Sequence, residues 1–431
     1  MNKVQEKFEK FSPYFMKFAN SKPIVAMKDG IILTMPLALV GSVFLLLAFM
    51  PITGWNEKMV SIFGSNWQEP LFQVTGATFD IIALVAVFGI AYTYAKRENH
   101  EPVSAGVLGI VSFIIVTASY VTDANGDKIG GVIPKGWTGG KGMIAAILVG
   151  LAVGCIYSWF MKRDIRIKMP EGVPTGVANA FSALIPGFAI MTLSMLVYIL
   201  FKVLVGQTFI EWVYVVLQTP IQGLTDSLGG GIAIAMLISL FWWFGIHGAA
   251  VVMGVMGPIC QSNSLANQEI INQGGELIAG ANAHIVTQQF VDQFITFGGS
   301  GMTLGLVIAM LLMAKSSHLK KLSQLSIVPG LFNINEPILF GFTMVLNPMM
   351  MIPFILVPVL SATITYFSIA LGFLKPFTAV QIPWTTPPIL SGFIVGGWRA
   401  ALLQVLLIVM ATIIYYPFFK MQDKIYLEQE K

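Results

Sequence analysis

Apolar residues along this chain gather in blocks of about 20 or more positions, and most charged residues fall between the blocks. Because a helix needs roughly 20 apolar residues to cross a bilayer, each block predicts a transmembrane helix. The short alternating segments typical of a membrane β-barrel are absent from the sequence. In the first half the blocks lie at about 29–50, 71–95, 102–121, 143–161 and 182–205.

Composition and charge agree with this pattern. The sequence is 56% hydrophobic and 11% charged, whereas soluble domains carry about 25% charged residues. Segments 96–101, 161–168 and 315–321 are basic, as are both ends of the chain, but the loops at 52–69 and 122–142 are not. Since cytoplasmic loops are enriched in lysine and arginine, we expect both termini in the cytoplasm. The net charge of +4 gives no reason to propose nucleic-acid binding.

Several shorter features complete the predicted architecture. Residues 1–21 mix aromatic residues with lysines, which is typical of an interfacial amphipathic helix, and 174–186 and 208–220 are also predicted to lie in the interface. No linker separates a soluble domain. Cys155 and Cys260 lack C-x-x-C spacing, so the sequence indicates neither a disulfide framework nor a metal site.

The second half of the chain cannot consist only of regular spans. Between Gly229, expected outside, and Lys315, expected inside, the obvious apolar runs are 230–259 and 301–314. Two crossings would return the chain to the wrong side, so the polar stretch 276–301 should add a crossing or a deep re-entrant turn. Polar segments at membrane depth are tolerated only inside protein or along an aqueous cavity. The sequence therefore predicts an aqueous cavity in the second half of the chain.

Prolines break the last third of the sequence. The apolar run from Pro337 to Leu374 is expected to be interrupted at its internal prolines, and 376–392 contains four more. We expect 326–340 and 376–392 to be re-entrant. The predicted fold is therefore all-α and polytopic, with about ten transmembrane helices, re-entrant hairpins and interfacial helices. Residues 1–205 should form a scaffold and dimerisation half, and 206–431 a sugar-binding transport half.

Two ionisable residues stand out from their surroundings. His247 lies between Gly245 and Gly248, where small residues let a ligand approach, and it follows Trp242 and Trp243. Glu336 sits between an asparagine-rich turn and a proline, and a carboxylate at membrane depth costs a few kcal/mol unless it is paired or wet. Tryptophan faces pack on sugar rings, while carboxylate, amide and imidazole groups take hydroxyl hydrogen bonds. The remaining ionisable residues in apolar regions have plainer roles as interfacial or structural groups, and they are Asp80, Lys202, Glu211, Asp292 and Arg399.

Four stretches together resemble a known family. "NINEP" followed by "ILFG", and also "FGIHG", "FITFGGSGMTLGL" and "IPWTTPPILSG", resemble the EIIC membrane component of bacterial sugar phosphotransferase systems, lactose/cellobiose/diacetylchitobiose family. The likeness covers essentially the whole chain. It implies that Glu336 and His247, the candidate catalytic residues, hold the hydroxyl to be phosphorylated. It also implies that Asn335 supports that site and that Trp384 and Trp242 stack on the sugar.

The resemblance implies partners and a mechanism as well. A homodimer of the bacterial inner membrane would bind a disaccharide outside, with cellobiose or another β-glucoside leading, and carry it by an elevator-like motion. A separate cytoplasmic phospho-EIIB protein would then phosphorylate its 6-hydroxyl, because neither cysteine here has the exposed, anion-friendly setting of a reactive thiol. No cofactor is expected. The rival interpretation is an ion-coupled secondary sugar transporter that uses Glu336 and His247 as a proton relay.

Overall fold

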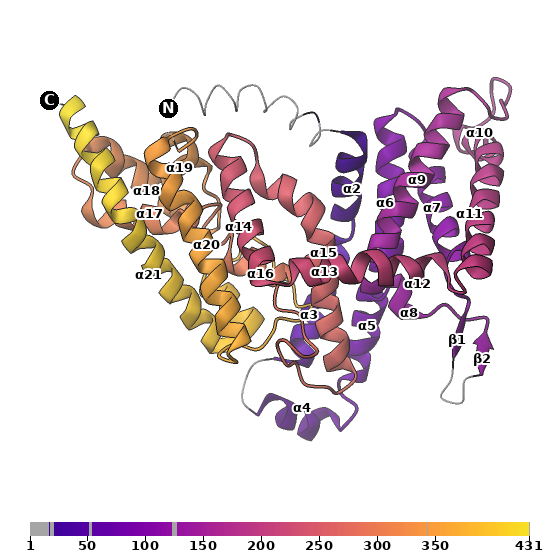
Figure 1. Ribbon diagram of the computed structural model, residues 1–431, viewed down its shortest axis with the longest axis horizontal. Coiled ribbons are helices and arrows are strands. Elements are labelled where there is room, and N and C mark those ends of the chain that lie inside the picture. Colours follow the sequence, from indigo (N-terminus) through magenta and orange to yellow (C-terminus); the bar gives the residue numbers. More distant parts are fainter. Residues whose placement is uncertain (1–16, 18–20, 51–53, 123–126, 343, 431) are drawn as a thin grey trace. The chain divides into compact units, whose positions relative to one another are not determined.

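The computed structural model describes residues 17, 21–50, 54–122, 127–342 and 344–430, and these are mostly helical (Figure 1). The predicted amphipathic helix at 1–21 falls almost wholly outside the described residues. The chain divides into two compact units. The first unit is Met1–Ala38 with Gly76–Ile221, and the second unit is Leu39–Thr75 with Gln222–Lys431.

The first unit is a helix bundle. Figure 1 shows α6, α7, α9 and α11 side by side, and α2 packs against α6. Between α7 and α9 the chain forms an antiparallel β-hairpin that pairs Val121 with Ile129. The elements are α2 (Lys22–Ile32), α6 (Ile82–Arg97), α7 (Pro102–Ile115), β1 (Tyr120–Thr122), β2 (Lys128–Gly130), α8 (Lys135–Thr138), η1 (Gly140–Gly142), α9 (Met143–Lys162), α10 (Thr175–Ser182), α11 (Leu184–Leu204), α12 (Phe209–Val213) and η2 (Tyr214–Gln218).

Glycines set the spacing of this bundle. A Cβ on Gly30 of α2 would lie 2.5 Å from the backbone nitrogen of Ile90 in α6, and one on Gly150 of α9 would lie 2.9 Å from the Ile90 Cβ. Small residues that let backbones approach closely are the usual packing device between membrane helices, where lipid removes the hydrophobic driving force. The bundle therefore depends on positions that cannot carry a side chain.

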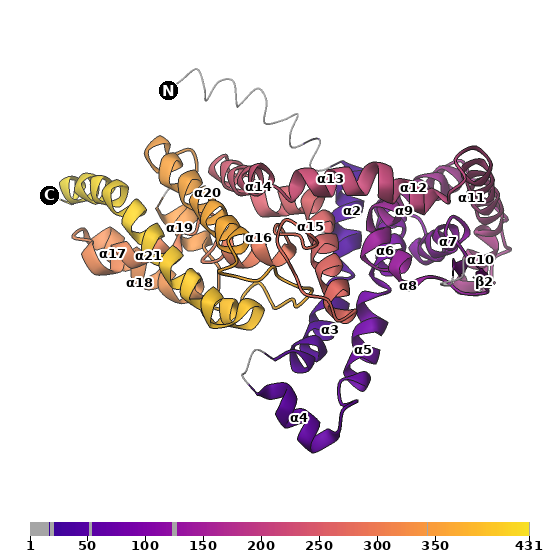
Figure 2. The ribbon, with the colours of Figure 1, turned by 60° about the horizontal axis from the view of Figure 1, so that its bottom comes forward.

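The second unit combines long helices with short ones. In Figure 2, α17, α18 and α20 lie beside α21, and α14 packs against α20. Helices α3, α5 and α13 each contain a boundary between the two units. The elements are α3 (Met35–Ala48), α4 (Trp55–Phe63), α5 (Glu69–Phe79), α13 (Thr219–Thr225), α14 (Leu228–Trp243), α15 (Gly248–Asn272), α16 (Gln288–Phe294), α17 (Leu304–Met313), α18 (Ser317–Leu331), α19 (Glu336–Gly341), α20 (Pro348–Ala370) and α21 (Leu390–Gln429).

The all-α polytopic membrane fold is confirmed. Among the described residues, 7 helices are long and apolar enough to cross a membrane, or up to 8 if the pair Phe209–Thr225 and Leu228–Trp243, bent by 76°, forms one span. Two shorter apolar helices, Pro102–Ile115 and Leu304–Met313, fall below that length. This count does not confirm the expected number of about ten.

The polar stretch 276–301 contains one short helix, α16, rather than a membrane-length one. Gln289 and Gln293 of this helix are each 2% exposed, so its amides lie inside the protein. No residue from 375 to 389 is helical.

The expected break of the apolar run at Pro353 and Pro358 is wrong, because α20 continues through both prolines. Both prolines are buried, and packing by neighbouring helices compensates for backbone hydrogen bonds that proline removes from a membrane helix.

Candidate functional site

His247 occupies a tight turn between two helices. Helix α14 ends at Trp243, and α15 begins at Gly248 with His247 as its N-cap. The His247 Nδ1 accepts a hydrogen bond from the Ala250 backbone nitrogen at 3.1 Å. This bond makes Nδ1 the acceptor, so the proton of the neutral ring sits on Nε2. The imidazole side chain is exposed and lies 4.5 Å from the Trp242 ring, measured between centroids.

Gly245 allows the turn to form. Its φ of 79° is in the left-handed region, which favours glycine, and its added Cβ would lie 3.2 Å from the Val345 side chain. The Trp243 carbonyl accepts from the Leu346 nitrogen at 2.8 Å, and the Trp243 Nε1 donates to the Asn347 carbonyl at 2.8 Å. The His247 turn is therefore held against the segment that follows α19.

Asn333 joins three loops that are distant in the sequence. Its Oδ1 accepts from the Gly298 nitrogen at 2.6 Å, and its Nδ2 donates to the carbonyls of Trp384 at 2.5 Å and Thr386 at 3.0 Å. Its own φ is 64°, a conformation that asparagine tolerates better than most residues. The asparagine therefore fixes the backbone that carries Trp384.

Asn335 anchors the start of α19. Its Nδ2 donates to the Ser300 carbonyl at 2.7 Å and to the Thr303 Oγ1 at 3.0 Å, and the residue is 6% exposed. It is the N-cap of α19, so Glu336 is the first helical residue. The Glu336 side chain is exposed. The asparagine amide faces the protein while the neighbouring carboxylate remains accessible.

All six predicted site residues belong to the second unit. Gly245, His247, Glu336 and Trp384 are exposed, whereas Trp242 and Asn335 are buried. The Trp242 Nε1 is buried and has no hydrogen-bond partner among the described residues. The turn that carries Trp242, Gly245 and His247 is hydrogen-bonded to the segment after α19. The turn before α19 is hydrogen-bonded to the backbone of Trp384.

Sequence reasoning assigned no role to some of the residues that build this region. Asn333 is one such residue, and Asp226 is another. The Asp226 Oδ1 accepts from the Ile285 and Val286 nitrogens at 2.7 Å each, and its Oδ2 lies 2.8 Å from the His284 Nδ1. These contacts hold the polar stretch before α16 in place. The asparagine in the irregular "NINEP" turn was a detectable signal, but nothing near Asp226 indicated a partner 58 residues away.

Other predicted ionisable residues have structural partners in the first unit. Asp80 lies 3.6 Å from the Lys135 Nζ. Lys202 donates to the Tyr120 hydroxyl at 3.0 Å. Glu211 forms a capping box with Thr208.

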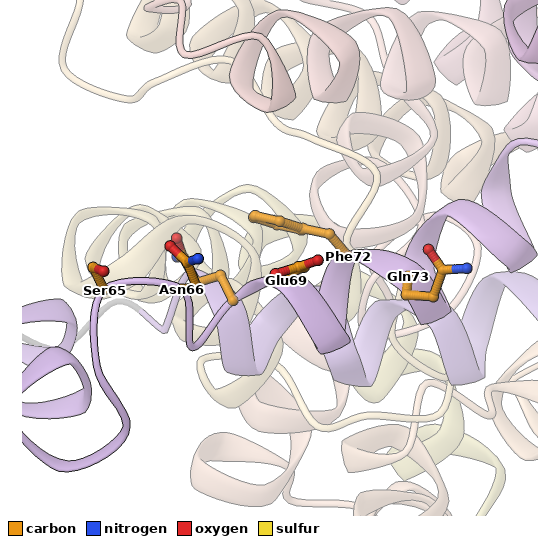
Figure 3. Close-up of a pocket in the computed structure, with 6 residues that line it drawn as sticks. Ser65, Asn66, Glu69, Phe72 and Gln73 are labelled. Carbon is orange, nitrogen blue, oxygen red and sulfur yellow. The ribbon is translucent and has the colours of Figure 1, made fainter.

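A separate cavity of about 460 Å³ lies beside α5 and the connection before it. Figure 3 shows Glu69 and Phe72 on the helix and Ser65 and Asn66 on that connection. One continuous segment, 65–73, supplies the whole lining, and none of the predicted site residues belongs to it. This cavity is therefore a local feature of the α4–α5 region.

The comparison with protein families decides the identity of the fold. The family model described as "Phosphotransferase system, EIIC" matches residues 28–358. The chain belongs to this EIIC family. The resemblance in the four sequence stretches is thus confirmed, and the protein is a membrane component of a sugar phosphotransferase system.

Relatives match this EIIC chain along nearly its full length. The lichenan permease IIC component of Bacillus subtilis is 39% identical over 100% of this chain and 96% of its own length. The cellobiose-specific EIIC component of Geobacillus stearothermophilus is 40% identical over 96% of this chain and 93% of its own length. The crystal structure of the transporter ChbC, the IIC component from the N,N′-diacetylchitobiose-specific system, is 37% identical, covers 98% of this chain and 99% of that chain, and superposes with a TM-score of 0.93.

Proposed function

We propose that this EIIC chain binds a β-linked disaccharide, with cellobiose or another β-glucoside leading, and carries it across the bacterial inner membrane. At the cytoplasmic side it presents the sugar 6-hydroxyl to a separate phospho-EIIB protein. Relatives named for cellobiose, lichenan and diacetylchitobiose support this substrate class. The proposal keeps both termini in the cytoplasm, as the basic segments predict.

The observation that carries the proposal is the way two distant segments are hydrogen-bonded to the ends of α19, the one with His247 after the helix and the one with Trp384 before it. Together with Glu336 at the start of α19, these segments offer an exposed carboxylate, imidazole and aromatic face. Trp384 is 57% exposed, although Asn333 fixes its backbone, so its ring is available to a ligand. Sugars match this combination, because their C–H faces pack on aromatic rings and their hydroxyls both donate and accept hydrogen bonds.

Glu336 and His247 are the proposed catalytic pair. Glu336 would accept the proton of the attacking hydroxyl, and His247, protonated on Nε2, would orient that hydroxyl. Phosphoryl transfer depends mainly on positioning and charge stabilisation, so this chain needs little further chemistry. Asn335 acts as a positioning residue, since its amide is directed into the protein.

The phosphoryl donor is proposed to be a cysteine of EIIB. Cys260 is 0% exposed, and burial raises the free energy of its thiolate. Cys155 is exposed, but it lies in the middle of the membrane-capable helix α9 and not in a loop. Neither thiol has the setting that a phosphocysteine requires.

For transport, we propose that residues 1–205 form the scaffold of a homodimer and that residues 206–431 move with the bound sugar. All candidate site residues fall in the second unit, which supports a binding site that stays intact during motion. The amphipathic stretches at 174–186 and 208–220 would serve as hinges in the interface.

A transport assay tests the function against its rival. Vesicles that contain this chain, a cognate EIIB and the general phosphotransferase proteins should accumulate cellobiose as its phosphate, and only with phosphoenolpyruvate. Accumulation of unmodified sugar that follows a pH gradient would instead establish the ion-coupled transporter. A panel of cellobiose, lactose and diacetylchitobiose in the same assay would identify the substrate.

A further inference from the structure

A cavity of about 560 Å³ lies in the second unit, at the ends of several membrane helices. Leu46 and Phe49 contribute from the end of α3, Gln268 and Ile271 from the end of α15, and Phe373 from just after α20. Because the C-terminal ends of three membrane-capable helices meet here, the cavity opens at the level of one membrane surface. Its volume falls within the range of about 300–1,000 Å³ that is usual for small-molecule sites.

Most of the cavity lining is apolar, but two cationic side chains, Lys375 and Arg399, also line it. Lys375 lines the cavity and lies 3.3 Å from the Glu276 carboxylate. Arg399 also lines it, and its guanidinium carbon lies 5.8 Å from the Phe373 ring and 5.6 Å from the Trp398 ring. Arg399 donates to the Phe373 carbonyl at 3.3 Å and has no carboxylate partner within the part of the chain that the structure describes. The cavity therefore combines an apolar body with an arginine that lacks a counter-ion.

The backbone shapes the cavity around these groups. Gly397 has φ 71° and ψ −165°, which interrupts the helical conformation of α21 just before Trp398 and Arg399. Gly396 also lines the cavity, and a Cβ there would lie 2.7 Å from the Ala400 Cβ. The kink lies directly before Trp398 and Arg399, and both of these residues line the cavity.

We infer that this cavity binds one anionic phospholipid. Arginine pairs strongly with phosphate, and basic residues near a membrane surface attract anionic lipids. The apolar lining suits an acyl chain. This assignment is independent of the sugar site, since neither His247 nor Glu336 lines the cavity.

The test is native mass spectrometry of the full chain in neutral detergent, titrated with phosphatidylglycerol or phosphatidylcholine of the same acyl composition. Half-saturation of the wild-type protein should need at least about fivefold less phosphatidylglycerol than phosphatidylcholine, because one charge contact with the anionic headgroup is worth about that factor. Arg399→Gln should abolish this preference. Arg163→Gln is the matched control, because Arg163 also lies over a tryptophan ring, that of Trp159, but lines no part of the cavity.

Ile271→Trp tests the apolar body of the site without changing its charge. The larger side chain should fill the cavity and reduce retention of phosphatidylglycerol at least about fivefold, while the thermal melting temperature confirms folding. The inference is overturned if Arg399→Gln and Arg163→Gln retain phosphatidylglycerol equally, or if Ile271→Trp retains it like the wild type. Displacement of the lipid by millimolar inorganic phosphate would also overturn it, because the site would then recognise a bare anion.

Discussion

The side-chain amide of Asn333 donates to the carbonyl of Trp384 across 51 residues of sequence, and its Oδ1 accepts from the Gly298 nitrogen. One asparagine thereby joins the glycine-rich loop before α17, the turn that carries Glu336, and the proline-rich segment that carries Trp384. The proposed sugar site depends on this junction, because none of the three segments is part of a long helix that would hold it.

Asn333→Asp should therefore weaken sugar binding. The carboxylate keeps the acceptor for Gly298 but loses the donor, so the carbonyls of Trp384 and Thr386 lose their partner. An unsatisfied buried polar group costs about 1–3 kcal/mol, and the dissociation constant for the sugar should rise about tenfold. Isothermal titration measures this. Asn282→Asp is the control, since Asn282 also bridges loop backbone, from Ile278 to Glu276, and its loop carries no site residue. An equal effect of both variants would contradict the prediction.

Trp242→Phe removes a buried indole nitrogen that has no hydrogen-bond partner among the described residues. Because an unsatisfied buried polar group costs about 1–3 kcal/mol, loss of this nitrogen should offset the packing lost with the smaller ring, and the melting temperature should fall little. Trp243→Phe should lower the melting temperature more, because the Trp243 Nε1 donates to the Asn347 carbonyl. Thermal unfolding in detergent measures both variants. A larger loss of stability for Trp242→Phe than for Trp243→Phe would contradict the prediction.

Glu336→Gln separates binding from chemistry. An amide can still hydrogen-bond to the sugar but cannot accept a proton, so the rate of sugar-phosphate formation should fall by about 10²–10⁴-fold. Sugar binding to the purified variant should change much less. The phosphoenolpyruvate-dependent vesicle assay measures the rate, and titration calorimetry measures binding. Wild-type rates in the variant would limit Glu336 to a binding role.

Gly30→Ala should destabilise the first unit. The new Cβ would lie 2.5 Å from the Ile90 nitrogen, a backbone atom that can move only with its helix. Overpacking of this kind costs about 1–3 kcal/mol, so the melting temperature in detergent should drop. Gly176→Ala is the matched helical control, because nothing lies within 4 Å of its added Cβ. If both variants melt alike, close α2–α6 packing does not limit stability.

Crosslinks test the proposed elevator-like motion in a background without Cys155 and Cys260. A crosslink between two copies of the first half should leave phosphorylation-coupled uptake largely intact, because that half is proposed to stay fixed. A crosslink between the two halves of one chain should stop uptake while sugar binding survives, since the site itself stays intact. The reverse pattern would show that the second half does not move against a static dimer.

The sequence by itself determined the membrane class, the family resemblance and the residues proposed for the site. Apolar blocks longer than a bilayer is thick leave few alternatives to helices, and the settings of His247 and Glu336 are visible within a few residues of each. These inferences use only chemistry that is local in the chain.

Only the tertiary structure decided how the second half holds together. Asn333 reaches 35 residues back to Gly298, and Asp226 reaches 58 residues forward to His284. Helix α20 continues through two prolines that its packing accommodates, and residues 39–75 join the second unit although they come early in the chain. Sequence patterns report neighbours within one or two helical turns, whereas these outcomes depend on which distant backbone groups meet in the folded chain, where every buried polar group requires a partner.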